Sequence, residues 1–193
     1  MKKYSLLLMM VFSVLSIHAQ KHDSDKEQDE AAFGRNNISI MLSDVVLKRV
    51  SFEYEHIFGD EGNMSINIPF SIAIGEADDV YGDQVNWWGG LGMKLYPTGQ
   101  GKIRYFVGPE VRVISAHYEG IDYSYYDGYT EEKDVKEEYI HTAFLLNNGF
   151  IYEPTKNFIF SVNLGVGFMS RDQKTGDGVQ PMATPSVRMG FRF

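Results

Sequence analysis

The chain has 193 residues, of which 44% are hydrophobic and 14% aromatic, and its formal net charge is −8. The length suits one domain, and the acidic balance argues against nucleic acid as a partner. The sequence contains no cysteine, which excludes disulfides, thiolate metal sites and the lipid-modified cysteine of a lipoprotein.

The N-terminal residues have the layout of a secretory signal peptide. Lys2 and Lys3 precede an apolar run from Leu6 to Ile17, and the small residue Ala19 follows. The run has about 12 residues, whereas a membrane-spanning helix needs roughly 20. We therefore expect residues 1–19 to be a signal peptide cleaved after Ala19 rather than an uncleaved anchor. Cleavage removes two lysines and leaves a net charge of about −10.

The rest of the chain divides into a short charged segment and one domain. Residues 20–33 are charged, poor in aliphatic side chains and without a regular period, which predicts a flexible periplasmic segment. In residues 34–193, apolar and polar residues alternate in eight segments, as in strands with two unlike faces. The segments are 37–43, 49–58, 64–74, 85–96, 103–115, 140–152, 158–168 and 183–193.

The two faces of these segments indicate what surrounds them. In 64–74, for example, Ile66, Ile68 and Phe70 lie on one face, with Asn67 and Pro69 opposite. In a soluble sandwich or a lipocalin-like barrel, the faces opposite the apolar stripes would be rich in Lys and Glu. Here they hold small residues, Asn, Gly and a few charges. The pattern predicts an all-β, eight-stranded antiparallel up-and-down transmembrane β-barrel with a narrow, filled lumen.

Two details of the connections refine this prediction. Short Gly-, Pro- or Asn-bearing turns alternate with longer polar connections, as between the periplasmic and outer sides of outer-membrane barrels. Pro69, Pro109 and Pro185 lie inside predicted strands and cannot donate a ladder hydrogen bond. We expect each to mark a bulge or a strand end.

The C-terminal strand carries the most informative pattern. Val187, Met189, Phe191 and Phe193 share one face, and the chain ends on the last of them. This ending resembles the C-terminal signal of bacterial outer-membrane proteins, which implies that Phe191 and Phe193 form an assembly signal for the barrel assembly machinery.

The domain as a whole resembles a known family. Over residues 34–193 the chain is similar to the small eight-stranded outer-membrane barrels typified by the membrane domain of OmpA and by OmpX. It also resembles barrel domains common in Bacteroidetes, in which a sequence like Phe52-Glu53-Tyr54-Glu55 follows a short first loop. The resemblance implies a Gram-negative outer membrane and contact with its lipid and lipopolysaccharide. It does not transfer a mechanism.

Charged residues on the inward faces form the first candidate site. An eight-stranded barrel holds side chains but hardly a water-filled pore, so buried charges must be paired. We expect an ion network that plugs the lumen, with Arg104 and Arg192 near Glu55. The alternative is a gate whose charges change partners and open a narrow, porin-like conductance for small solutes. The candidates are Glu53, Glu55, Lys94, Arg104, Glu110, Arg112, Arg188 and Arg192.

Residues 118–138 of the connection 116–139 form the second candidate site, because they combine five tyrosines with eight acids. Tyrosine gives amphipathic contact area at low entropic cost, so this predicted extracellular loop could bind a protein or a glycan. The alternatives are a solvated mobile loop, or acids that share divalent cations with lipopolysaccharide. The tyrosines are Tyr118, Tyr123, Tyr125, Tyr126 and Tyr129.

No motif indicates catalysis. The patterns GxSxG, HExxH, Walker and Rossmann are missing from the sequence. Ser115 and His117 share a face near the outer rim, but they reverse the His-x-Ser order of lipid A deacylases. A lipid A hydrolase is therefore the weakest alternative. We expect no catalytic residue, metal or cofactor, and a structural or surface-interaction role at the outer membrane.

Overall fold

The structure is a computed structural model. It describes residues 34–59, 62–75, 84–126, 129–170 and 178–193, without the side chains of 118–126 and 129–136. The predicted signal peptide and residues 20–33 lie outside this part.

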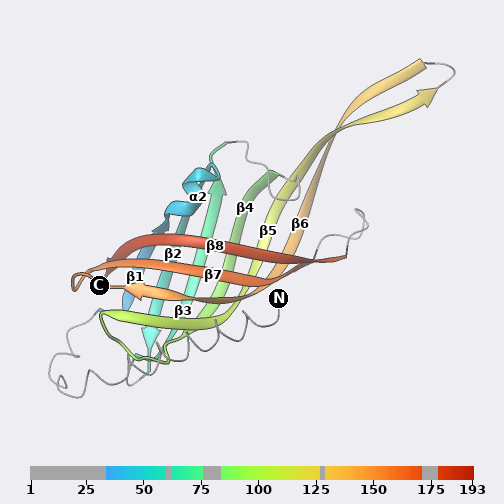
Figure 1. The fold of residues 1–193 in the computed structure, drawn as a ribbon. Coiled ribbons are helices and arrows are strands. Elements are labelled where there is room, and N and C mark those ends of the chain that lie inside the picture. Colours follow the sequence, from blue (N-terminus) through green and yellow to red (C-terminus); the bar gives the residue numbers. More distant parts are fainter. Residues whose placement is uncertain (1–33, 60–61, 76–83, 127–128, 171–177) are drawn as a thin grey trace, which may run out of the picture.

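Eight strands form a closed barrel in which each strand pairs with its sequence neighbours and β8 pairs with β1 (Figure 1). This confirms the predicted barrel topology. The elements are β1 (Asn36–Met41), α2 (Leu42–Val46), β2 (Arg49–Phe58), β3 (Met64–Ala73), β4 (Gln84–Leu95), β5 (Ile103–Tyr126), β6 (Tyr129–Tyr152), β7 (Phe158–Ser170) and β8 (Val179–Arg192).

The barrel has two unlike ends. The β2–β3, β4–β5 and β6–β7 connections lie at one end, which we call the turn end. The ends of the barrel domain also meet there, because the Asn36 amide donates to the Phe193 carbonyl over 2.9 Å. The opposite end, which we call the hairpin end, carries α2, the β3–β4 and β7–β8 connections and the tip of β5–β6.

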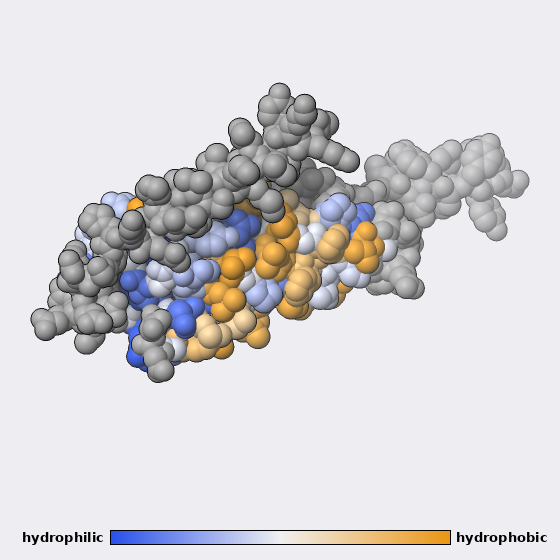
Figure 2. Space-filling view, turned by 60° about the horizontal axis from the view of Figure 1, so that its bottom comes forward, coloured by the Kyte–Doolittle hydropathy of each residue, from blue (hydrophilic) through white to orange (hydrophobic). Residues whose placement is uncertain are grey.

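Apolar side chains cover the outside of the barrel. In β3 the outward Ile66, Ile68 and Phe70 are 44–52% exposed, whereas Ser65 and Asn67 between them are buried. Figure 2 shows apolar residues gathered across the described part of one face, beside a more hydrophilic end. Aromatic side chains add to this surface near the turn end, where Tyr105 packs on Phe150 with ring centroids 5.3 Å apart. The molecule thus exposes apolar side chains on its outer face and buries many polar and charged ones inside, the reverse of a soluble barrel.

The connection 116–139 is not a loop, contrary to the expectation. The β5–β6 register continues without a shift from Ile103↔Tyr152 to Tyr126↔Tyr129, which leaves only residues 127–128 between the strands. The local sequence explains this, because aromatic and β-branched residues favour strands and Asp-Gly favours a two-residue hairpin turn. The many acids of the segment had suggested a solvated loop.

The prolines do not shift the register, contrary to the expectation. Pro69 opposes Glu53, Pro109 opposes Leu146 and Pro185 opposes Leu164 in continuous ladders. The ladders to β4 are interrupted at Pro69 and Pro109 but resume in the same register. The register shift lies instead in β4, between Val85 and Trp87. The extra residue turns Val85 into the lumen, where it is 6% exposed, although it was expected on the outer face with Trp87.

The first connection also differs from the expected loop. β1 ends at Met41, and residues Leu42–Val46 form the short helix α2, which contacts β8 and β2. The chain then returns through Lys48, whose φ is +53°. Among the described residues, no helix has the length and apolarity needed to cross a membrane.

Candidate functional site

All eight charged side chains predicted for the lumen lie inside the barrel and are at most 5% exposed. They come from β2, β4, β5 and β8, and each occupies an inward position of its strand. The structure does not gather them into one cluster. It divides them among three groups, centred on the carboxylates of Glu53 and Glu55, Glu110, and a residue that the sequence reasoning missed, Glu153.

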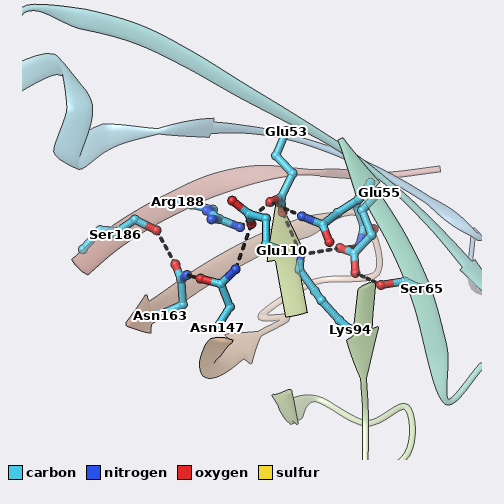
Figure 3. Close-up of polar contacts among 12 residues, drawn as sticks. Glu53, Glu55, Ser65, Lys94, Glu110, Asn147, Asn163, Ser186 and Arg188 are labelled. Carbon is cyan, nitrogen blue, oxygen red and sulfur yellow. Dashed lines mark hydrogen bonds and ion pairs between the residues drawn. The ribbon is translucent and has the colours of Figure 1, made fainter. Parts of the chain in front are cut away.

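Glu53 holds two cations from opposite sides of the lumen. Its Oε1 lies 2.7 Å from Lys94 Nζ and its Oε2 lies 2.5 Å from Arg188 Nη1. The Asn67 amide donates to the same Oε2 over 3.0 Å. Figure 3 shows these groups converging from different strands. Because β2, β4 and β8 are tied together through one carboxylate, the group acts as a crosslink inside the barrel.

Glu55 shares Lys94 with Glu53 but is otherwise held by neutral donors. Its Oε2 lies 3.3 Å from Lys94 Nζ and accepts from the Asn37 amide over 2.8 Å. Its Oε1 accepts from Ser65 over 2.5 Å and from the Tyr96 hydroxyl. Each carboxylate oxygen therefore has at least two partners, as a buried charge requires.

Glu110 and Arg112 form a pair on one strand. Arg112 Nε donates to Glu110, and its guanidinium carbon lies 4.1 Å from the ring centroid of Trp88, a cation–π contact. Gly90 makes room for this arrangement, because a Cβ there would lie 3.2 Å from Arg112 Cγ.

An amide chain links Glu110 to the far wall of the barrel. Asn147 donates to Glu110 over 2.8 Å, Asn163 donates to Asn147 over 3.4 Å, and Ser186 donates to Asn163. Figure 3 shows this chain running from Glu110 toward β8. Neutral side chains thus complete the hydrogen bonds of a carboxylate whose one ionic partner in the described structure is Arg112.

Arg104 and Arg192 were expected near Glu55, but the described ion pairs of both are with another carboxylate. Both pair with Glu153, at 3.1 Å and 3.0 Å, and both donate to the Gln100 side-chain oxygen. Glu153 directly follows β6 and is 6% exposed. The β6 alternation, continued by one residue past Tyr152, places it inward, but the predicted segment ends at Tyr152.

A second missed acid lies at the hairpin end. Asp44 of α2 is 7% exposed, and its Oδ2 accepts from Ser51 over 2.5 Å. Ser51 lies 2.6 Å from Ser71. With Asp44 and Glu153 included, the buried interior of the described part holds five acids and five Lys or Arg side chains. The helix α2 was not predicted, so this inward position could not be read from an alternation.

Between Asp44 and the charged groups, most buried side chains are apolar, although the buried His141 lies opposite Ile114. Met41, Val85, Trp88, Ile114, Ala143 and Met169 form a buried cluster, with Met182 packed against it. We call these seven residues the hairpin-end cluster. They come from β1, β4, β5, β6, β7 and β8, so the cluster lines the lumen along every strand except β2 and β3.

The five tyrosines of the second candidate site fall on both faces of the β5–β6 hairpin. Tyr126 pairs with Tyr129, and by strand parity Tyr118 shares their face. Tyr123 and Tyr125 occupy the other face. Their side chains lie outside the described part. Beyond His117 and Thr142, the two strands pair only with each other in the described ladders, and Figure 1 shows them projecting from the barrel.

The Ser115/His117 pair and the C-terminal aromatics lie at opposite ends of the barrel. His117 Nδ1 lies 2.6 Å from the Asn86 side-chain oxygen, and Ser115 opposes Trp87 and Ile140 in the sheet. Phe191 and Phe193 are 59% and 60% exposed on the outer surface. The described residues include no group of three His, Asp or Glu side chains placed to hold a metal ion.

Comparisons with known proteins identify the fold. No family model matches the sequence, and no curated protein matches it either. The N-terminal β-barrel domain of Pseudomonas aeruginosa OprF matches with a TM-score of 0.50 at 13% identity, over 83% of this chain and 99% of that domain. The Yersinia pestis outer membrane protein Ail, solved in a phospholipid bilayer nanodisc, matches at 0.31 and 14%, over the same shares. At this identity, the OprF match shows that the chain has the fold of a small eight-stranded outer-membrane barrel.

Proposed function

We propose that this chain is an integral outer-membrane protein, without enzymatic activity, whose plugged barrel anchors a surface-binding hairpin. The β5–β6 hairpin carries this proposal. It continues for nine residue pairs beyond the barrel wall, from Tyr118↔Glu137 to Tyr126↔Tyr129, or about 30 Å at the usual rise of a strand. A ribbon of this length has no part in closing the barrel.

The exterior supports the membrane placement. Every strand carries well-exposed apolar side chains on its outer face, including Ile68 at 52% and Phe144 at 55%. A surface this apolar is stable only against lipid. The expected result is that folded protein partitions with detergent and migrates differently from boiled protein in cold SDS gels. Protein that stays dissolved and folded without detergent would contradict the placement.

The interior supports an anchor rather than a channel. A narrow conductance for small solutes would need charges that hydrate or exchange partners, whereas the buried acids each hold at least one cation or hydroxyl donor. In planar bilayers we expect no steady single-channel current. Large, steady currents from the unmodified protein would favour the channel instead.

The hairpin's composition suggests its partner. Residues 118–138 contain eight acids and two lysines, a net charge of −6, together with five tyrosines. A mainly negative ribbon with aromatic rings suits a cationic surface on a partner outside the cell.

The test replaces residues 120–135 by a short Gly/Ser linker. The barrel should still fold, because its wall does not include them. Binding of whole cells to immobilised polylysine should fall to the level of cells without the protein. Changing Glu131, Glu132, Glu137 and Glu138 to Gln, with the tyrosines kept, should weaken binding in proportion to the lost charge. Unchanged binding by the linker variant would overturn the proposed role, and selective binding to a neutral glycan would replace the partner class.

The C-terminal stripe supports recognition by the barrel assembly machinery. Phe191 and Phe193 are exposed side by side along one face of the last strand. Replacing Phe193 by Asn should slow assembly into the outer membrane, with Val166→Asn as a control of equal polarity elsewhere on the exterior. Equal assembly of both variants would contradict a specific role for the terminal residue.

A further inference from the structure

The barrel wall is incomplete in its hairpin-end half. β1 has six residues, whereas its neighbour β8 has fourteen. β8 pairs with β1 only over Arg188–Arg192, and its remaining residues pair only with β7 in the described ladders. On the other side of this break, Arg49–Ser51 of β2 lie beyond the β1 ladder. The helix α2 occupies the space between the two strands (Figure 1).

The sequence of β8 is adapted to this break. The Phe193 amide points to β1 and the Arg192 amide points to β7, so the odd-numbered residues of β8 direct their amides toward the break. Pro181 and Pro185 occupy two of these positions and have no amide hydrogen. An unpaired N–H is costly in a membrane. The prolines remove two such groups at the edge, which is where a strand tolerates proline.

Among the described residues, α2 is the element that lies across the break. Its outward residues Val45, Val46 and Leu47 are 54%, 84% and 44% exposed, so they continue the apolar exterior. Its polar ties are few: Asp44 bonds to Ser51, and Ser43 accepts from the Val187 amide at 3.5 Å. No side chain caps its N-terminus. A five-residue helix held in this way is a movable plug rather than a wall.

Behind α2 lies the hairpin-end cluster rather than the charge network. Three of its seven members are methionines, whose flexible thioethers adapt to irregular apolar shapes. On the same side of β8, two buried oxygens have no hydrogen-bond partner: Gln180 Oε1 and Thr184 Oγ1. Both belong to the segment that has no β1 neighbour. The region therefore combines an adaptable apolar interior with unmet capacity to accept a hydrogen bond.

We propose that the hairpin-end interior binds the alkyl chain of a single-chain amphiphile with a hydroxyl-bearing head, which reaches it sideways from the lipid when α2 is displaced. The alkyl chain packs against the cluster methionines, and the head donates to Gln180, the acceptor nearer the end of the barrel. The break opens onto the apolar exterior, and the charge network below blocks passage further into the barrel. The proposal rests on the membrane placement but is independent of the hairpin's role.

The chain's two tryptophans allow a direct test, because Trp87 is 39% exposed on the outside and Trp88 is 5% exposed inside. In nanodiscs of unbrominated lipid, the probe is a monoglyceride of dibrominated stearic acid, which quenches tryptophan on contact. Trp87→Phe leaves only the inner reporter, and we expect the probe to remove most of its emission. Trp88→Phe leaves only the outer reporter, which the probe should quench wherever the barrel lies in the bilayer.

A crosslink supplies the matched control. Ser43→Cys with Val187→Cys, added to Trp87→Phe, places the only cysteines of the chain across the break. In the oxidised form the quenching of Trp88 should be lost, and in the reduced form it should return. Equal quenching in both forms would show that the chain does not enter past α2.

The outcomes separate the two proposals. If Trp88 of the uncrosslinked protein is not quenched while Trp87 is, the amphiphile site is wrong and the membrane placement stands. If Trp87 is not quenched either, the membrane placement itself fails. The uncrosslinked variants decide the matter even where the disulfide does not form.

Discussion

The two halves of the barrel interior are occupied by different kinds of side chain. Toward the turn end, charged side chains cross the lumen and bond to one another, as Glu53 does with Lys94 and Arg188. Toward the hairpin end, apolar side chains such as Met41 and Met169 fill the same width. The stability of the charged half depends on each buried charge having a partner, whereas the stability of the apolar half depends on how closely its side chains pack. The wall around them differs as well, because β1 and β8 pair beside the charged half but not beside the apolar half.

The largest effect should come from breaking the charged half at its centre. Glu53→Ala leaves Lys94 and Arg188 buried without their shared carboxylate, which should cost about 3–5 kcal/mol of unfolding free energy. Urea titration of the folded protein in detergent measures the loss. Glu138→Ala, at an exposed position near the base of the hairpin, is the control and should change stability by less than about 0.5 kcal/mol. Equal small losses for both would mean that the buried charges do not depend on one another.

In the apolar half, the expected effect is a cavity rather than an unpaired charge. Met169 is 2% exposed inside the barrel, and Met169→Ala should cost about 2–5 kcal/mol. Val166→Ala, at an outward position of the same strand, should cost less because lipid or detergent refills the space. The same urea titration compares the two. A larger loss at Val166 would contradict the packed interior.

The Glu110–Arg112 pair lies between the two halves and should show coupling. Glu110→Ala and Arg112→Ala should each destabilise, and the double variant should cost less than their sum by about 0.5–3 kcal/mol. The reason is that each single change leaves the other charge buried. Strict additivity would mean that Arg112 depends on Trp88 rather than on its carboxylate partner.

The smallest expected effect is a difference in hydrogen-exchange rate between two backbone amides of β8 in the barrel wall. Met189 opposes Ile40 in the β1–β8 ladder, whereas Ala183 faces the break at an equivalent odd-numbered position. Hydrogen exchange of the folded protein should therefore be faster at Ala183. Equal protection would indicate that an unassigned acceptor closes the wall at this height.

Much of the fold followed from local sequence because a strand has two faces. The eight stripes, the even strand number and the inward position of all eight predicted charges come from the alternation of residues. Errors arose where the alternation is interrupted or misread. The bulge between Val85 and Trp87 moves a valine into the lumen without any local sign, and the acids of 116–139 obscured a regular hairpin that ends in Asp-Gly.

The partners of the charges, by contrast, depend on how the strands are staggered around the closed barrel. Alternation places Arg104 and Arg192 inside, but only the register and the β4–β5 and β6–β7 turns bring them to Glu153 and Gln100. The same holds for the wall. Pro181 and Pro185 are visible in the sequence, yet they mark an edge only because β1 stops at Met41 and α2 takes its place. Local periodicity determines which way a side chain points, and closure of the barrel determines what it meets there.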